Sequence, residues 1–139
     1  MKNHKIDVIF FDKIKTDKKL LVQVMKRLIE EQNIKEQVSI SIVLVGNKTI
    51  KELNKNFRKK NKVTSVLSFP LLGKRKFVTG GKRLSLCDII INIEKLKKAK
   101  DLKNTLKENL THSFLHLLNF SHKDMEKEEK KLMEALSDI

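Results

Sequence analysis

The stretch from Val38 to Val45, which reads VSISIVLV, decides the fold class. It begins as a strict alternation of apolar and polar residues and ends fully apolar, which predicts a strand with at least one buried face. A second run, Leu84 to Asn92 (LSLCDIIIN), has an unbroken apolar second half and predicts an interior strand. Shorter strands are predicted at Val8 to Phe11 and at Val66 to Pro70, where the only proline of the chain stops the strand.

Helical segments lie between and after these strands. Apolar residues recur at helical spacing from Lys18 to Gln32, with Thr16 or Asp17 as the N-cap. A short helix capped by Asn47 follows the strand at 38–45. Its apolar stripe is predicted to consist of Ile50, Leu53 and Phe57.

The C-terminal third is predicted to be helical. A helical turn over Lys95 to Lys100 precedes a helix that opens at Asn104 or Thr105 and runs to Leu118, and a final helix spans Asp124 to Leu136. With 139 residues and 16.2 kDa, the chain can bury one core but not two. The sequence therefore predicts a single α+β domain over residues 1–139.

Basic residues are concentrated in the middle of the chain. Lys and Arg number 31 against 17 Asp and Glu, and residues 47–83 hold twelve basic residues and one acid, Glu52. A general lysine bias would enrich the whole chain and would not remove acids from one segment. The segment therefore predicts a polyanionic partner, either nucleic acid or an anionic membrane surface.

The remaining composition indicates a cytoplasmic protein. The apolar run Val8 to Phe11 is too short for a signal-peptide core or a membrane span. Cys87 is the only cysteine, so neither a disulfide nor a cysteine-based zinc site can form within one chain.

Three of the four histidines lie in the stretch HSFLHLLNFSH, residues 112–122. On a wheel of about 100° per residue, the core stripe gathers around Leu106, whereas His112 and His116 fall on the far flank. Because they are four residues apart, the two imidazoles project side by side and can share one ion. The stripe consists of Leu106, Leu110, Ser113, Phe114 and Leu117.

The third histidine strengthens the prediction of a metal. Asn119 is a suitable left-handed residue to end the helix, and a turn there can bring His122 back toward the other two. Histidines at positions 0, +4 and +10 with a turn residue at +7 match the long zincin spacing. Three neutral imidazoles favour one zinc ion per chain, with a fourth position open for water as in catalytic sites.

The residues absent from this pattern narrow the chemistry. A zincin protease needs Glu directly after the first histidine, where this chain has Ser113, and a deaminase needs a Cys-x-x-Cys arm. With an open zinc site beside a strongly basic segment, a phosphodiester of a nucleic-acid backbone is the natural electrophile.

Three blocks of this sequence resemble the YbeY family of bacterial endoribonucleases. HSFLHLLNFSH is similar to that family's H-G-x-L-H-L-x-G-Y-D-H signature. NKNFRKKNKVTSVLSFP (54–70) resembles its N-x-x-F-R-x-x-x-x-x-T-D-V-L-S-F-P segment, and LCDIIIN (86–92) resembles its L-G-D-I strand. The order and spacing of the blocks agree over most of the chain.

The resemblance implies a mixed four-stranded sheet packed with helices, and a metal cleft lined by the helix that carries the histidines. It implies zinc at His112, His116 and His122, catalytic roles for His116 and Arg58, and cleavage of single-stranded RNA. The implied substrate is the 3′ end of the small-subunit ribosomal RNA, with a further role in ribosome quality control and no role for DNA or a membrane. The residues predicted to contact RNA phosphates are Arg58, Lys59, Lys60, Lys62, Lys74, Arg75 and Lys76.

The chain departs from the family pattern at six positions: Ser113, Asn119 and Cys87 replace Gly, Phe120 replaces Tyr, and Ser121 and Ser65 replace Asp. Loss of the tyrosine hydroxyl and the aspartate can remove groups that orient the imidazoles, at a cost of about 10–100-fold in zinc affinity. We therefore expect a working but weaker site.

Two rival functions fit the same residues. A non-catalytic ribosome-assembly factor would use zinc only to hold the last two helices together and its lysines to hold RNA. A metallohydrolase of a small phosphorylated substrate would show little dependence of binding on salt, whereas RNA binding falls steeply with salt.

Overall fold

The computed structural model describes residues 4–34, 37–70, 83–118 and 122–139, without the side chains of Pro70, residues 83–87 and His122. The predicted turn residue Asn119 falls outside this part of the chain. So do Lys74, Arg75 and Lys76, which were predicted to contact RNA.

The described strands form one mixed sheet, as predicted. They are β1 (Lys5–Phe10), β2 (Gln37–Val45), β3 (Val66–Pro70) and β4 (Arg83–Asn92), in the spatial order β1-β2-β4-β3. β2 pairs with β1 and β4 in parallel, and β3 pairs with β4 in the antiparallel sense. β3 is therefore an edge strand, which is where a strand tolerates a proline.

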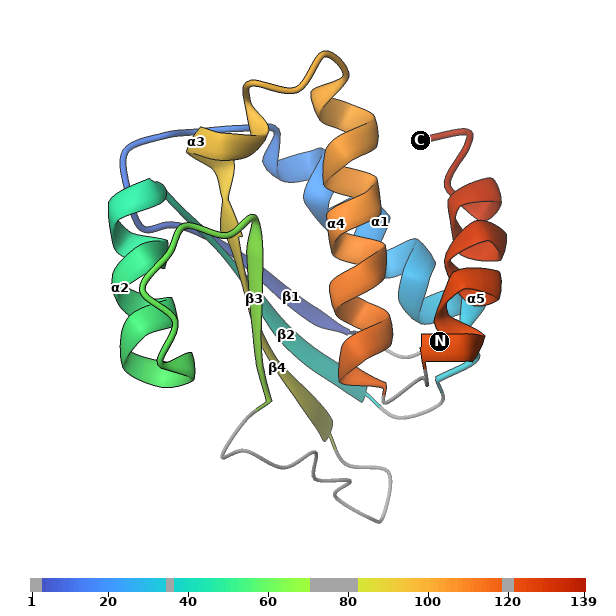
Figure 1. Ribbon diagram of the computed structural model, residues 1–139. Coiled ribbons are helices and arrows are strands. Elements are labelled where there is room, and N and C mark those ends of the chain that lie inside the picture. The colour runs from blue at the N-terminus through green and yellow to red at the C-terminus, as the bar shows by residue number, and fades with distance from the viewer. Residues whose placement is uncertain (1–3, 35–36, 71–82, 119–121) are drawn as a thin grey trace.

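Helices cover both faces of the sheet (Figure 1). α2 (Asn47–Arg58) lies on one face, whereas α1 (Lys18–Glu31), α4 (Leu102–Leu117) and α5 (His122–Ala135) lie on the other. The short α3 (Ile93–Leu96) follows β4 directly. The α+β prediction is confirmed, and among the described residues no helix has both the length and the apolar character to cross a membrane.

The main core lies between the sheet and α1, α4 and α5. In β2, alternate residues are buried, so the alternation that predicted this strand marks the face that packs on the helices. α1 contributes six buried side chains at helical spacing. A smaller second core under α2 consists of Val45, Ile50, Leu67 and Ile90.

The start of α2 differs from the prediction. Gly46, not Asn47, is the N-cap, and two carboxylates from elsewhere in the chain accept from the first backbone N–H groups. Asp12 accepts from Gly46 N at 2.7 Å, and Glu94 accepts from Asn47 N at 2.9 Å. The Asn47 side chain instead accepts from Asn92, so tertiary contacts replace the local cap.

Other boundaries shift by a few residues. Asp17 rather than Thr16 caps α1, by accepting from Leu20 N. α4 begins at Leu102 because Asp101 accepts from Asn104 N, so the predicted start at Asn104 or Thr105 is wrong. The helical turn expected from Lys95 begins at Ile93, with Asn92 as its cap, and α5 begins at His122 rather than at Asp124.

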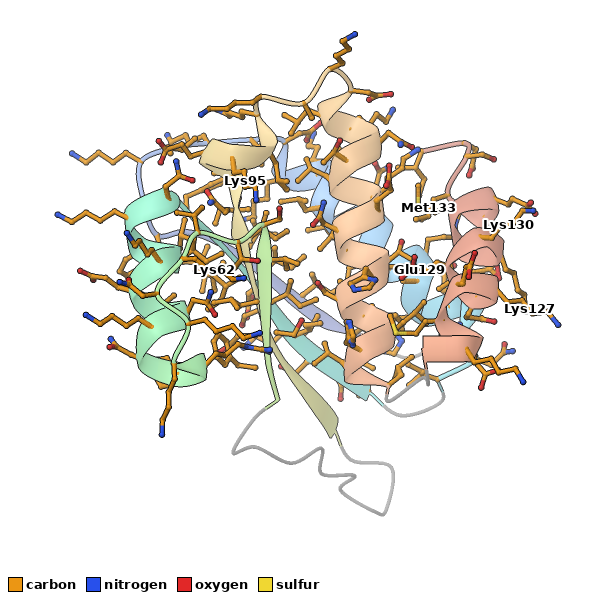
Figure 2. The ribbon with its side chains drawn as sticks, in the orientation of Figure 1. Lys62, Lys95, Lys127, Glu129, Lys130 and Met133 are labelled. Atoms are coloured by element: carbon orange, nitrogen blue, oxygen red, sulfur yellow. The ribbon has the colours of Figure 1, made fainter. Side chains whose placement is uncertain are left out.

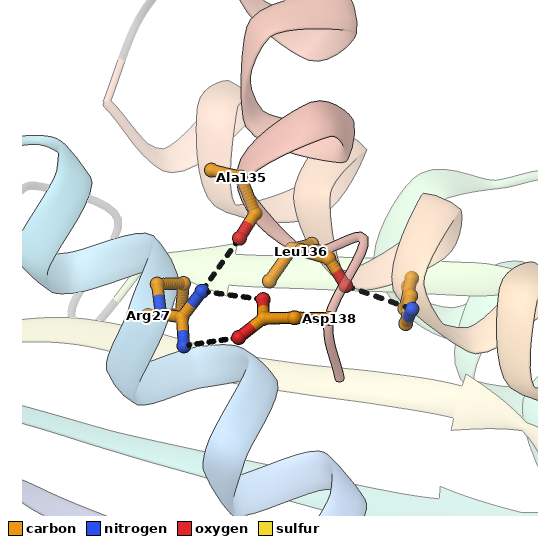
Figure 3. A network of polar contacts seen from close by, with 5 residues as sticks. Arg27, Ala135, Leu136 and Asp138 are labelled. Carbon is orange, nitrogen blue, oxygen red and sulfur yellow. Dashed lines mark hydrogen bonds and ion pairs between the residues drawn. The ribbon is translucent and has the colours of Figure 1, made fainter.

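Polar contacts fix the C-terminal end of α5 against α1 and α4. Arg27 donates to the Ala135 carbonyl at 2.6 Å and pairs with the Asp138 carboxylate at 2.8 Å (Figure 3). From α4, the buried Lys107 donates to the Leu136 carbonyl at 2.8 Å. These residues, Arg27, Lys107 and Asp138 with the two carbonyls, are called the C-terminal cluster below.

Candidate active site

α4 presents both of its histidines on an exposed flank. His112 and His116 are exposed, whereas Ser113 and Phe114 between them are buried in the core. The predicted orientation of the helix is thereby confirmed. Burial extends beyond the predicted stripe to Thr111 and Leu115, because α4 packs against the sheet on one side and α5 on the other.

The two imidazoles of α4 face each other. His112 Nε2 and His116 Nε2 are 2.9 Å apart, and the ring centroids lie 4.4 Å apart with an interplanar angle of 83°. Side chains four residues apart on a helix are neighbours, so α4 brings both basic nitrogens to one point. At this distance one of the two nitrogens can donate a hydrogen to the other.

Glu129 of α5 determines which nitrogen of His112 is basic. Its carboxylate contacts His112 Nδ1. An ionised carboxylate can only accept, so Nδ1 carries a hydrogen, and in the neutral form of the ring Nε2 is then the nitrogen with the lone pair. His112 therefore presents to His116 the nitrogen that is able to bind a metal. Sequence reasoning missed Glu129, since only the antiparallel packing of α5 on α4 brings it to His112.

A cleft of about 440 Å³ lies beside the histidines. One wall is α4 and the other is the edge strand β3, whose Val66 and Ser68 pair with residues of β4 that face the main core. The cleft is lined by Arg58, Thr64, Val66, Ser68, His112, Ser113, His116 and Leu117.

Arg58 reaches this cleft from the opposite face of the sheet. It is the last residue of α2, and Lys59 ends the helix in a left-handed conformation with φ of 57°. Because β3 is an edge strand, the Arg58 side chain can pass around it, and its Nη2 donates to the Ser68 carbonyl at 3.1 Å. The structure thus brings together Arg58 and the two histidines, which are far apart in the sequence.

Two buried asparagines hold the segment between α2 and β3. The Asn54 side chain donates to the Lys62 carbonyl at 3.0 Å, and Asn92 donates to the Thr64 carbonyl at 3.1 Å. The prediction that Phe57 joins the buried stripe of α2 is wrong, because Phe57 is 68% exposed and the buried residues of the helix are Ile50 and Asn54. The sequence signal for Asn92 is its place directly after the apolar run of β4, where a buried amide needs partners.

Ser113, one of the departures from the family pattern, lies at the base of the cleft. Its hydroxyl is buried and has no hydrogen-bond partner among the described residues.

The remaining predicted site residues are not among the described residues that line the cleft. Lys59, Lys60 and Lys62 are exposed in and after the turn that ends α2. His122 is the first residue of α5, but its side chain is not described. Among the side chains that are described, no three from His, Cys, Asp and Glu are grouped to hold a metal ion.

The fold and the cleft define a class of protein. An arginine that faces paired imidazoles, beside an exposed run of lysines, is suited to binding and cleaving a phosphate ester. A family model described as Endoribonuclease YbeY matches residues 2–139. The chain belongs to the YbeY family of endoribonucleases.

Individual relatives agree with the family match. The Endoribonuclease YbeY of Caldicellulosiruptor bescii is 39% identical over 124 residues, which cover 81% of this chain and 75% of that protein. That of Pelagibacter ubique is 37% identical over 129 residues, with coverage of 85% and 82%. The solution structure of TM1509 from Thermotoga maritima matches with a TM-score of 0.61 and 27% identity, over 94% of this chain and 87% of that one.

Proposed function

We propose that this chain is a single-domain, zinc-dependent endoribonuclease of single-stranded RNA that matures the 3′ end of small-subunit ribosomal RNA. The proposal rests on one observation: Arg58, His112 and His116 line the same cleft. Family membership supports RNA as the substrate. The ribosomal substrate, the role in ribosome quality control and a cytoplasmic location extend the same proposal.

His112, His116 and His122 are the proposed zinc ligands, with one ion per chain. The described residues fit this role because the contact of Glu129 with His112 Nδ1 leaves Nε2 as the metal-binding nitrogen of the neutral ring, and this nitrogen lies 2.9 Å from His116 Nε2, close enough to share an ion. Neutral imidazole is a preferred ligand of zinc. Bound zinc would supply Lewis acidity, which lowers the pKa of the attacking group and stabilises charge on the phosphate.

Arg58 is the proposed electrostatic catalyst. Its guanidinium can donate two parallel hydrogen bonds to phosphoryl oxygens as negative charge develops on them. The hydrogen bond to the Ser68 carbonyl holds the side chain at the cleft, and a second donor edge stays available for phosphate. The arrangement accommodates either water or a 2′-hydroxyl as the nucleophile.

The lysines have a separate, sequence-independent role. Lys59, Lys60 and Lys62 are exposed next to Arg58, so they can contact the phosphates that flank the bond to be cleaved. The same role is proposed for Lys74, Arg75 and Lys76 on the evidence of the charge pattern alone. Neutralising these last three together should weaken binding to unrelated RNAs alike and flatten the dependence of affinity on salt.

The proposal is tested by measuring zinc content and cleavage of single-stranded RNA for the wild type and for His116→Ala. Lys103→Ala is the control, because Lys103 is exposed on α4 and does not line the cleft. The wild type and the control should each bind about one zinc and cleave, whereas His116→Ala should lose both properties. If His116→Ala and zinc removal left cleavage unchanged, the catalytic proposal would be wrong. If no protein cleaved RNA but all bound it, the assembly-factor function would replace it.

A further inference from the structure

Phe57 is an exposed aromatic ring beside the catalytic arginine. Its side chain is 68% exposed although it belongs to α2, a helix that buries Ile50 and Asn54 against the sheet. The ring packs on Phe69 of β3, with centroids 5.5 Å apart and an interplanar angle of 67°. Phe69 is half-buried and packs against the second core. It therefore supports the Phe57 ring on the side of the sheet, and most of the Phe57 surface faces solvent.

The aromatic pair is continuous with the cleft. The Arg58 guanidinium carbon lies 6.0 Å from the centre of the Phe69 ring, a distance at which a cation over an aromatic ring is stabilised. Arg58 also lines the cleft with the histidines. Phe57, Phe69 and Arg58 therefore form one surface that leads around the edge strand to the candidate active site.

The surroundings of Phe57 are strongly basic. Lys55, Lys59 and Lys60 are exposed on the same turn of α2 and just after it, and Glu52 is the only acid in residues 47–83. Figure 2 shows the side chains of this helix extending outward from the sheet, with Lys62 on the segment beside it. An apolar ring bordered by cations matches the two parts of a single-stranded nucleic acid, a flat base and an anionic backbone.

We propose that Phe57, supported by Phe69, is a stacking platform for one unpaired base of the RNA, next to the phosphate that Arg58 binds. The proposal rests on the proposed function and adds a subsite to it. A base within a duplex is already stacked and paired, so the platform favours single strands. One ring offers the area of one base, far less than the roughly 800 Å² per partner of a stable protein interface.

The first test compares two probes of equal length and charge: an eight-residue oligouridine and an eight-unit abasic tetrahydrofuran phosphate. The affinity of each probe is measured by fluorescence anisotropy, at times too short for measurable cleavage. Phe57→Ala should weaken oligouridine binding about 5- to 150-fold, the range for one stacked base, without changing the affinity for the abasic probe. Its salt dependence should match that of the wild type, because no cation is lost.

Phe11→Ala is the matched control. Phe11 is 66% exposed, similar to Phe57, but its backbone binds Leu44 near the N-terminal end of α2. Phe57 lies ten residues after Asn47, so the helix separates its two ends by about 15 Å. Phe11→Ala should leave both affinities unchanged.

A spectroscopic test reports stacking directly. The chain has no tryptophan or tyrosine, so Phe57→Trp introduces the only indole. Oligouridine should quench its fluorescence and the abasic probe should not, whereas Phe11→Trp should respond to neither. If Phe57→Ala left oligouridine affinity unchanged, or weakened both probes equally, the platform would be refuted even with RNA cleavage intact. Failure of the wild type to bind either probe would instead refute the proposed function and the platform with it.

Discussion

Two polar regions contact α5, and they differ in the kinds of groups that they bring together. The C-terminal cluster of Arg27, Lys107 and Asp138 pairs cations with carbonyls and a carboxylate. The cleft cluster, defined as Arg58, His112, His116 and Glu129, places two basic nitrogens 2.9 Å apart beside an open cleft. In the first, complementary groups satisfy one another. In the second, Glu129 pairs with His112, and the two imidazoles lie together at the wall of the cleft, an arrangement suited to sharing a ligand.

If the proposed function is right, the helix pair of α4 and α5 contributes to stability at one end and to catalysis at the other. Loss of a group from the C-terminal cluster should therefore lower stability and leave the activity of the folded molecules intact. Loss of a group from the cleft cluster should do the reverse. The following changes test that division, from the largest expected effect to the smallest.

Arg58→Ala should reduce the single-turnover rate of RNA cleavage by about 100-fold or more, the usual cost of losing one electrostatic stabiliser. Zinc content and thermal stability should stay near those of the wild type, because Arg58 is exposed. Arg58→Lys should recover only part of the rate, since an ammonium lacks the planar two-donor edge. If RNA affinity fell as much as the rate, Arg58 would be a phosphate anchor only.

Glu129→Ala should weaken zinc binding by about 10–100-fold, because His112 loses the carboxylate that fixes its tautomer and orientation. Glu129→Gln should weaken it less, since the amide oxygen can still accept from Nδ1. Competition with a chromophoric chelator measures the affinity. Glu134→Ala, an exposed position on the same helix, is the control. Equal affinity for Glu129→Ala and the wild type would contradict this role.

Lys107→Met should lower the free energy of unfolding by about 1–3 kcal/mol, because the Leu136 carbonyl loses a charged donor. Denaturant titration measures this change, with Lys103→Met as the exposed control on α4. The cleavage rate per folded molecule should not change. Unchanged stability would mean that burial of the ammonium costs as much as its hydrogen bond contributes.

Asp138 should give a small stabilisation that depends on pH. The hydrogen bond from Arg27 holds the pKa of the Asp138 carboxyl below its ordinary value. Its contribution is therefore complete above the unfolded pKa of about 3.9 and is lost as the pH falls through the lower folded pKa. The difference in Tm between the wild type and Asp138→Asn should be present at about pH 6 and vanish at strongly acidic pH. A difference that did not depend on pH would indicate a contribution other than charge.

The sequence by itself determined the elements and the direction of the main side chains. Apolar periodicity placed the strand at 38–45 and the flank on which His112 and His116 lie, because side-chain direction repeats with a fixed period along a strand or helix. The charge pattern marked the basic segment, and the motif blocks identified the family. These signals are local, so they need no knowledge of which distant residues meet.

The tertiary structure alone decided which of these features meet. The sheet order makes β3 an edge strand, and only then can Arg58 pass from one face of the sheet to the histidines on the other. The antiparallel packing of α5 on α4 brings Glu129 to His112. Phe57 was predicted to join the core stripe but is exposed, whereas Asn54 is buried and its amide donates to the Lys62 carbonyl of the following segment. Contacts between residues distant in sequence depend on strand order and helix packing, which hydrophobic periodicity does not encode.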